Sequence, residues 1–440
     1  MLKRLIEEKL TEFAKSDDKK CLLVRGARQV GKTFSVEQFG MNSGLFTSFI
    51  SINFLKEPEI KAVFQGSLDV DTMQLNITLY KPEAIFIPGK TLIMLDEIQE
   101  CPEAVTSLKF WAEDGRYKVI ATGSMLGIDY KRPLSYPVGY ITYADMHPLN
   151  FREFLWAVGI QENVIKALHQ MFLNGTQVPE AMHSKMMQYL QLYMTVGGMP
   201  EVVTTYLSQN SLSATDEKQK SILQDYRYDI AHYAKADVKI KAEKCFFSLP
   251  VQLTKDNHKF QYSVIEKGGN KRKYESSLDW LSGAYLVKEC KAVTKIEFPL
   301  TNFEETDNLR LYPLDIGLFT GMFDYSLKAA LHTENGTGYP FIGQAKGGLY
   351  EALIADILFK NHHQELYFYK NDTSRIEIEF LIPTQDGVVP IEVKAGNSRS
   401  ASLDKILKDE NIPYGYKLVS GNVGFTGKKR TFPLYMAMFI

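Results

Sequence analysis

One stretch of this sequence constrains the rest more than any other: Gly26-Ala27-Arg28-Gln29-Val30-Gly31-Lys32-Thr33. It fits the pattern G-x-x-x-x-G-K-[ST] without a mismatch. The apolar run Cys21–Val24 comes directly before it and predicts a short buried strand, and residues 34–39 predict the start of a helix. A glycine-rich loop between a strand and a helix turns its backbone N–H groups toward an anion. We therefore predict a phosphate-binding loop in a parallel α/β sheet, with a chance glycine-rich turn as the alternative.

The residue types in this loop suit ATP with Mg²⁺ as cofactors. Gly26 and Gly31 let the backbone bend tightly and approach a polyphosphate. Lys32 is predicted to reach the β- and γ-phosphates and so to act in catalysis, and the Thr33 hydroxyl is predicted to hold Mg²⁺. The predicted ATP-binding residues are Gly26, Ala27, Arg28, Gln29, Val30, Gly31, Lys32, Thr33 and, from the next motif, Asp96.

The second motif, Thr91-Leu92-Ile93-Met94-Leu95-Asp96-Glu97, ends an apolar run in two acids. Such a run predicts a strand buried on both faces of a parallel sheet. Its acids would emerge at the carboxyl end of the strand, where open α/β sheets bind ligands. We predict that Asp96 holds the Mg²⁺ ion with Thr33. We predict that Glu97 orients or deprotonates the attacking water.

A third buried strand is predicted over Tyr117–Ser124, with a polar end. Thr122 or Ser124 would sense the γ-phosphate from this position, and Thr122 is our catalytic candidate. A helix cap or turn is the equally strong alternative. Arg132, in the loop that follows, is a candidate arginine finger across a subunit interface, although a solvated loop arginine is the simpler interpretation.

Composition sets wider limits on function. The 440 residues favour about three domains. A formal net charge of -1 gives no overall sign of nucleic-acid or lipid binding, so any basic surface must be local. The four cysteines are far apart, with no C-x-x-C pair, and the chain starts with charged residues. We therefore expect a cytoplasmic protein without disulfides, zinc site, signal peptide or membrane partner.

The middle of the chain divides into two predicted regions. Residues 151–240 look helical, with Gly197-Gly198-Met199-Pro200 as a sharp break between two helices. After this come a short helix, a small strand or turn over residues 262–266, a second helix, and a hairpin over residues 287–289 and 311–314. Helix, helix and hairpin is the order of a winged helix.

A basic run lies inside the predicted winged helix. It carries six basic residues and three acids, a local charge of +3 that makes DNA a candidate partner, although most such runs are simply solvated. The basic residues are Lys255, Lys259, Lys267, Lys271, Arg272 and Lys273, and the acids are Asp256, Glu266 and Glu275.

The C-terminal part carries a second constellation of charged residues. An amphipathic helix over residues 348–359 contains Glu351, and alternating strands carry Glu379 and then Glu392-x-Lys394. This spacing matches the PD-(D/E)xK nuclease core, in which strand carboxylates bind Mg²⁺ and the lysine stabilises charge at the phosphate. Glu379 stands where aspartate is usual. A half-exposed sheet edge with solvated charges is the alternative interpretation.

These blocks together resemble a family of prokaryotic AAA-type ATP-binding proteins with an uncharacterised C-terminal domain. The blocks are GARQVGKT at 26–33, LDEIQ at 95–99, TGSMLG at 122–127, SYPVG at 135–139, HPLNFREFL at 147–155, GGMPEVV at 197–203, YPLDIGL at 312–318, and GGLYEALIADIL, EIEFLI and IEVKAG near the end. The resemblance implies an ATPase core at 1–150, a helical subdomain at 151–240, a winged helix at 241–325 and a restriction-endonuclease-like α/β domain at 326–440. It implies ATP and Mg²⁺ binding at residues 26–33, Asp96 and Glu97.

Our sequence-based expectation is an Mg²⁺-dependent ATP-binding protein, an ATPase, whose nucleotide state controls a DNA-associated C-terminal module. Oligomerisation is compatible with this expectation. The alternatives are a non-catalytic nucleotide switch and a protein-remodelling ATPase, each with an inactive nuclease-like domain.

Overall fold

A computed structural model describes residues 2–123, 137–255, 258–332, 340–361, 365–394, 396 and 400–440. The chain forms two compact units. The N-terminal unit contains Lys3–His147 and Gly283–Tyr285, and the C-terminal unit contains Pro148–Ser282 and Leu286–Ile440. Among our predicted residues, Ser124, Arg132 and Asp256 lie outside the described part of the chain.

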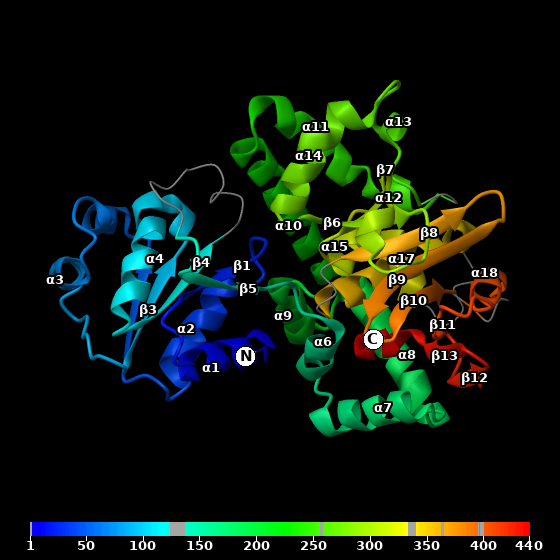
Figure 1. Ribbon diagram of the computed structural model, residues 1–440, viewed down its shortest axis with the longest axis horizontal. Helices are drawn as coiled ribbons and strands as arrows, with labels where there is room; N and C mark the ends of the chain where they lie inside the picture. Colours follow the sequence, from blue (N-terminus) through cyan, green and yellow to red (C-terminus); the bar gives the residue numbers. More distant parts are fainter. Residues whose placement is uncertain are drawn as a thin grey trace. The chain divides into compact units, whose positions relative to one another are not determined.

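The N-terminal unit is built on a five-stranded parallel sheet in the order β2-β3-β4-β1-β5 (Figure 1). This is the strand order of P-loop ATPases, so the predicted fold class is confirmed. β4 lies between the strand that precedes the phosphate loop and the strand that ends in Asp96. The strands are β1 (Cys21–Arg25), β2 (Ser48–Asn53), β3 (Thr91–Asp96), β4 (Lys118–Gly123) and β5 (Ile141–Asp145).

Helices cover this sheet because its central strands, β1, β3 and β4, are buried on both faces. Every residue of β3 is buried, as expected for a central parallel strand. α2 packs on β3 and β4, whereas α4 packs on β1, β4 and β5. The helical segments are α1 (Ile6–Lys15), α2 (Lys32–Asn42), η1 (Pro58–Phe64), α3 (Val70–Tyr80), η2 (Ile98–Glu100) and α4 (Pro102–Asp114).

The C-terminal unit begins with helices, as predicted for residues 151–240. The break at Gly197 separates α8 from α9, which starts at Pro200. Residues 262–265 form a short helix, so the small strand or turn expected there is corrected. The helices are α6 (Phe151–Ala157), α7 (Glu162–Asn174), α8 (Glu180–Val196), α9 (Pro200–Gln209), α10 (Leu212–Tyr233), α11 (Ala236–Phe247), α12 (Leu249–Leu253), α13 (Tyr262–Ile265), α14 (Lys271–Gly283), η3 (Leu300–Phe303), α15 (Ile316–Gly321), α16 (Tyr325–His332), α17 (Pro340–Lys360), α18 (Ala401–Ile406) and η4 (Leu434–Phe439).

An eight-stranded mixed sheet forms the rest of this unit, in the order β12-β13-β11-β10-β9-β8-β6-β7. The central pairs β8/β9 and β9/β10 are antiparallel. β6 pairs in parallel with β8, and β10 pairs in parallel with β11. The strands are β6 (Val287–Val293), β7 (Glu304–Pro313), β8 (Leu366–Asn371), β9 (Ile376–Thr384), β10 (Gly387–Val393), β11 (Gly415–Val419), β12 (Gly424–Thr426) and β13 (Lys429–Pro433).

The predicted hairpin forms as the antiparallel pair β6/β7, with longer strands than expected. However, β6 also pairs with β8, so the hairpin is part of the large C-terminal sheet. A free wing would leave the outer edge of this strand unpaired. The winged-helix assignment is therefore not confirmed, and the boundary at 325/326 stays a prediction.

Several sequence blocks named above meet in a buried polar cluster of the C-terminal unit. Lys360 Nζ lies 2.9 Å from Asp315 Oδ2 and 2.8 Å from Asp356 Oδ1. Asp315 also accepts from the backbone N–H of Gly198, at 2.7 Å. Leu149 donates its N–H to the Gly198 carbonyl. Because buried charges need partners, these contacts hold α8, α15 and α17 together. They also bring residues of separate sequence blocks into one cluster.

No helix among the described residues combines the length and apolar character that crossing a bilayer requires.

Candidate functional site

The predicted phosphate loop joins β1 to α2, as its sequence requires. Gly31 caps α2 in the left-handed region, at φ 94° and ψ 22°, and Gln29 also has a positive φ of 64°. At Gly26 a Cβ atom would stand 2.1 Å from the Met146 carbonyl oxygen. Only glycine fits this approach, so Gly26 and Gly31 have a backbone reason for being glycine.

Lys32 is buried at the start of α2, with 8% of its surface exposed. Its Nζ donates to the carbonyls of Gly26, at 3.0 Å, and Ala27, at 2.7 Å. Burial lowers the pKa of Lys32 to about 8, and the nearby Glu97 and Asp96 carboxylates oppose that shift. To reach a phosphate, the ammonium group must exchange these two carbonyls for phosphate oxygens, which neutralise its charge better.

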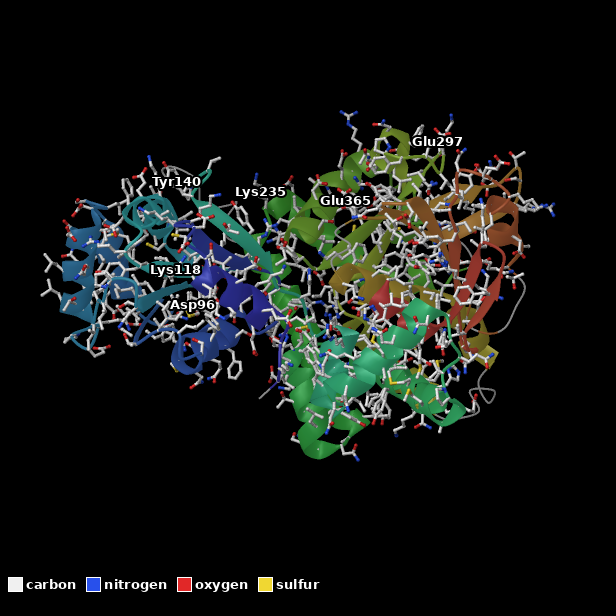
Figure 2. All side chains as sticks on the ribbon, turned by 60° about the horizontal axis from the view of Figure 1, so that its bottom comes forward. Asp96, Lys118, Tyr140, Lys235, Glu297 and Glu365 are labelled. Carbon is white, nitrogen blue, oxygen red and sulfur yellow. The ribbon has the colours of Figure 1, made fainter. Side chains whose placement is uncertain are left out.

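Asp96, labelled in Figure 2, ends β3 and contacts side chains from β2, β4 and the end of the phosphate loop. Its Oδ1 accepts from Thr33 Oγ1, at 2.8 Å, and from Thr122 Oγ1. Its Oδ2 accepts from Asn53 Nδ2, at 2.6 Å. Parallel strands bring their carboxyl ends to one edge of a sheet, which is why Asn53, Asp96 and Thr122 meet there.

The Thr33 and Asp96 oxygens fit Mg²⁺. This ion is bound through one or two protein oxygens and phosphate oxygens, and it keeps several waters. A hydroxyl and a carboxylate already in contact at the foot of the phosphate loop supply such a pair. When bound, Mg²⁺ would neutralise charge on the phosphates.

Glu97 follows Asp96 in a left-handed conformation, at φ 54° and ψ 45°. Non-glycine residues adopt this conformation rarely, and mostly where function or packing demands it. Glu97 Oε2 accepts from the side-chain amide of Gln99. Gln99 is buried, and its Oε1 has no hydrogen-bond partner among the described residues.

Two residues of this site were not predicted as site residues. Asn53 is the last residue of β2, and a lone asparagine at the end of a strand gives no signal of its partner. Gln99 belongs to the LDEIQ block, so its presence beside two acids was the available signal. The structure places Thr122 beside Asp96, to which its hydroxyl donates, and its role in sensing the γ-phosphate stays a prediction.

The residues predicted for the nuclease-like site also lie close together, but the Glu351 carboxylate already has hydrogen-bond and ion-pair partners within the protein. It lies buried in α17, at 3% exposure. Arg310 Nη1 donates to its Oε1 at 2.8 Å, the Tyr312 hydroxyl donates to the same oxygen, and His258 Nδ1 lies beside Oε2. Burial alone would raise the pKa of Glu351, but Arg310, His258 and Tyr312 lower it to about 2.

Glu379 and Glu392 lie on adjacent strands and share one lysine. Ile391 pairs with Phe380 across β9 and β10, so the next positions in that register are Glu392 and Glu379. Lys394 Nζ lies 3.1 Å from Glu379 Oε1 and 3.2 Å from Glu392 Oε1. Burial raises the pKa of Glu379 to about 7, which Lys394 opposes and the neighbouring carboxylates reinforce.

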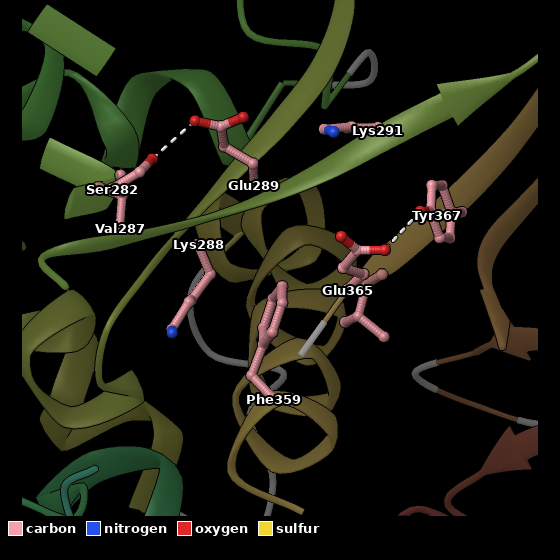
Figure 3. A pocket seen from close by; sticks show the side chains of 9 residues that line it. Ser282, Val287, Lys288, Glu289, Lys291, Phe359, Glu365 and Tyr367 are labelled. Carbon is pink, nitrogen blue, oxygen red and sulfur yellow. Dashed lines mark hydrogen bonds between the residues drawn. The ribbon is translucent and has the colours of Figure 1, made fainter. Parts of the chain in front are cut away.

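A separate cavity of about 260 Å³ opens beside β6 (Figure 3). Tyr367 donates to Glu365, and Ser282 donates to Glu289, across its wall. Lys291 is paired with Glu304, at 2.9 Å. The charged residues of the lining are two lysines and two glutamates, Lys288, Lys291, Glu289 and Glu365, so the cavity shows no preference for a ligand of one charge.

Comparisons with known proteins agree with the first site. Residues 18–155 match the family model described as AAA domain. Residues 187–328 match Domain of unknown function (DUF8612), and residues 346–436 match Domain of unknown function (DUF4143). The sequence matches none of the curated proteins.

Solved structures give distant likenesses. The Walker-type ATPase PABY2304 of Pyrococcus abyssi is 14% identical, with a TM-score of 0.43, over 73% of this chain and 96% of that chain. Cdc6p from Pyrobaculum aerophilum is 11% identical, with a TM-score of 0.27, over 75% and 93%. Drosophila ORC bound to DNA is 12% identical, with a TM-score of 0.25, over 76% and 95%.

These scores are too low to assign a function, so the assignment rests on the AAA match and the site geometry. The N-terminal part of the chain is an AAA-type, ATP-binding ATPase domain. The AAA part of the resemblance drawn from the sequence is thus confirmed. Its winged-helix and PD-(D/E)xK parts are not confirmed, because the two other family models carry no known function.

Proposed function

We propose that this protein is an Mg²⁺-dependent ATPase whose nucleotide state controls a DNA-associated C-terminal module. The contact between Thr33 Oγ1 and Asp96 Oδ1, at 2.8 Å, carries the first half of this proposal. It brings together, from two distant motifs, the two oxygen groups that an Mg²⁺–ATP complex requires beside a phosphate loop.

The roles of the site residues follow from their positions. The loop amides of residues 26–33 bind the phosphates, and Lys32 neutralises the γ-phosphoryl group as it transfers. Thr33 and Asp96 hold Mg²⁺, and Asn53 and Thr122 fix the Asp96 carboxylate. Glu97 acts on the attacking water, which completes hydrolysis by positioning and electrostatics rather than by a covalent intermediate.

Substitution of Glu97 tests the hydrolytic half. We expect Glu97→Gln to bind ATP with nearly unchanged affinity and to lose about 10²–10⁴-fold in kcat, the usual contribution of a general base. Phosphate release in single turnover and equilibrium ATP binding are the two measurements. Glu100→Gln, which alters the next acid in the same segment, is the matched control. Equal turnover by Glu97→Gln and wild type would refute the role of Glu97.

The proposed link to DNA is supported by exposed basic side chains around α13 and α14. Lys255, Lys267, Arg272 and Lys273 are all exposed. Some of the local charge is neutralised, because Lys273 lies 2.7 Å from Glu266 and Lys271 lies 3.4 Å from Asp307. The remaining positive side chains are suited to a phosphate backbone rather than to base recognition.

Binding of duplex DNA, followed by fluorescence anisotropy at several salt concentrations with and without ATP, tests this link. The triple variant Lys255→Glu, Lys267→Glu and Arg272→Glu should bind more weakly and show a smaller salt slope. A control triple, Lys9→Glu, Lys90→Glu and Lys408→Glu, makes the same change of charge at exposed positions elsewhere. No salt-dependent retention of DNA by wild type would contradict the link.

A second candidate function is a nucleotide switch or protein-remodelling ATPase whose nuclease-like domain is inactive. The observation that favours it is the commitment of Glu351 to Arg310, which removes one of the three expected carboxylates. DNA binding without cleavage, or no DNA binding at all, distinguishes these alternatives from a nuclease.

A further inference from the structure

The carboxylates of the C-terminal unit lie among cations supplied by the chain itself. Arg310 Nη1 lies 2.8 Å from Glu351, and Arg310 also pairs with Glu377. Lys370 Nζ lies 3.3 Å from the other oxygen of Glu377. Lys394 lies between Glu379 and Glu392, within 3.2 Å of each. The four acids therefore meet three permanent cations and one histidine, His258.

Arg310 is fixed in this position. Its side chain is 1% exposed, and its guanidinium lies 4.2 Å from the centre of the Phe368 ring. Removing one partner of such a buried pair leaves an uncompensated buried charge and is strongly destabilising. Glu351 can therefore leave Arg310 only at high cost, and it is not available as a metal ligand.

The two remaining carboxylates offer little to a divalent ion. Glu379 uses Oε1 for Lys394 and accepts the Val393 N–H at Oε2, at 3.3 Å. Glu392 Oε1 pairs with Lys394, and its buried Oε2 is the one carboxylate oxygen of the pair that accepts no hydrogen bond from the described residues. An ion between them would have to stand where the Lys394 ammonium stands. Within the described ranges, no three His, Cys, Asp or Glu side chains form a group suited to a metal.

We infer that Arg310 and Lys394 act as the counter-cations of this cluster, so that its carboxylates Glu351, Glu379 and Glu392 hold no divalent ion and do not support metal-dependent hydrolysis of nucleic acid. The magnesium that the nuclease-like motif implies does not fit the residues as they are paired here. The sequence departure at Glu379 agrees with this, since the motif's usual aspartate is shorter. The inference concerns the C-terminal unit alone and stands whether or not the proposed ATPase roles hold.

Binding of Mn²⁺ to the full-length protein without nucleotide, followed by loss of the free-ion EPR signal, tests the inference. We expect Glu392→Gln to leave Mn²⁺ binding by wild type unchanged. We expect Lys394→Met to gain a site, with Mn²⁺ affinity raised at least about tenfold, because two carboxylates then face each other without a cation. Adding Glu392→Gln to Lys394→Met should abolish that gain.

Controls separate this site from the ATPase site. Asp96→Asn identifies any Mn²⁺ bound at the phosphate loop, and its effect bears on the proposed function alone. Wild-type Mn²⁺ binding that Glu392→Gln removes and Asp96→Asn preserves would overturn the inference, as would DNA cleavage that Glu392→Gln abolishes. Failure of Lys394→Met to gain Mn²⁺ would overturn the role given to Lys394. Lys394 is 27% exposed, and Lys394→Gln is the second variant if the methionine variant does not fold.

Discussion

Gln99 donates a side-chain hydrogen bond to Glu97, two residues earlier, and so restrains the carboxylate that follows the last residue of β3. Gln99→Ala would free this carboxylate while leaving the phosphate loop untouched. We expect kcat for ATP hydrolysis to fall at least about tenfold, with ATP affinity within about twofold of wild type. The measurement is steady-state hydrolysis with independent ATP titration.

A double variant that combines Gln99→Ala with Glu97→Gln tests whether Gln99 acts through Glu97. Because it acts through Glu97, Gln99→Ala should add little to Glu97→Gln, a non-additivity expected of residues in contact. Gln65→Ala, an exposed glutamine of the same unit, is the control. Fully additive losses would mean that Gln99 acts independently of Glu97.

Asn53 supports the metal-binding acid. Its Nδ2 lies 2.6 Å from Asp96 Oδ2, so Asn53→Ala removes one of the three side-chain donors to Asp96. We expect the Mg²⁺ concentration for half-maximal hydrolysis to rise about 10–100-fold, the range seen when groups behind a metal ligand are removed. An Mg²⁺ titration of activity checks this, with exposed Asn42→Ala as control. An unchanged Mg²⁺ dependence would show that Asn53 does not position Asp96.

Substitution of Gly198 tests the packing of the buried polar cluster in the C-terminal unit. A Cβ at this position would stand 2.0 Å from the Leu149 carbonyl oxygen, and that carbonyl is held in place by the Tyr193 hydroxyl, at 2.9 Å, and by Lys360 Nζ, at 3.4 Å. Gly198→Ala should destabilise the protein by about 1–3 kcal/mol or more through overpacking. Gly347→Ala, an exposed helical glycine with open space around it, should instead stabilise it by about 0.5–1 kcal/mol. Thermal unfolding of both variants decides the matter, and equal melting temperatures would contradict the packing described.

Glu351 gives a pH dependence with a defined sign. Its pKa in the folded protein is about 2, below the ordinary value of 4.5, because of Arg310, His258 and Tyr312. The stability it contributes is thus fully present above pH 4.5 and is lost as the pH falls toward 2. Glu351→Gln should cost about 3–5 kcal/mol near neutral pH. That cost should shrink as the pH is lowered below about 4.

Urea unfolding at a series of pH values, followed by tryptophan fluorescence, measures this difference. Exposed Glu410→Gln is the control, and it should show no such trend. A cost for Glu351→Gln that stays constant from neutral to acid pH would mean that Glu351 carries no depressed pKa.

Local motifs account for what the sequence could predict. The loop at 26–33 and the acids at 96 and 97 lie in continuous stretches whose chemistry depends on neighbours in the chain. Their strands are apolar throughout, so their burial was also predictable. The parallel order of the sheet then brings Thr33, Asp96 and Thr122 together, as expected from the position of each at the end of its element.

The features that the sequence could not predict depend on contacts between residues far apart in the chain. Arg310 meets Glu351 across 41 positions, and His258 meets it across 93. No spacing rule reports such pairs, so the sequence could suggest a metal ligand at Glu351 but not the arginine that occupies it. Likewise, the pairing of β6 with β8 depends on a parallel crossover through α15, α16 and α17, which a hairpin pattern does not reveal.

Equilibrium binding of ATP to wild-type protein and to Lys32→Ala, with and without Mg²⁺, tests the ATP site most directly. Lys32 contributes a buried charge at the phosphate loop, so we expect the variant to bind ATP at least about tenfold more weakly, a loss of ~1.4 kcal/mol or more. Lys90→Ala, an exposed lysine of the same unit, should bind as wild type does. Binding by Lys32→Ala that equals wild type in the presence of Mg²⁺ would show that the nucleotide does not occupy this loop.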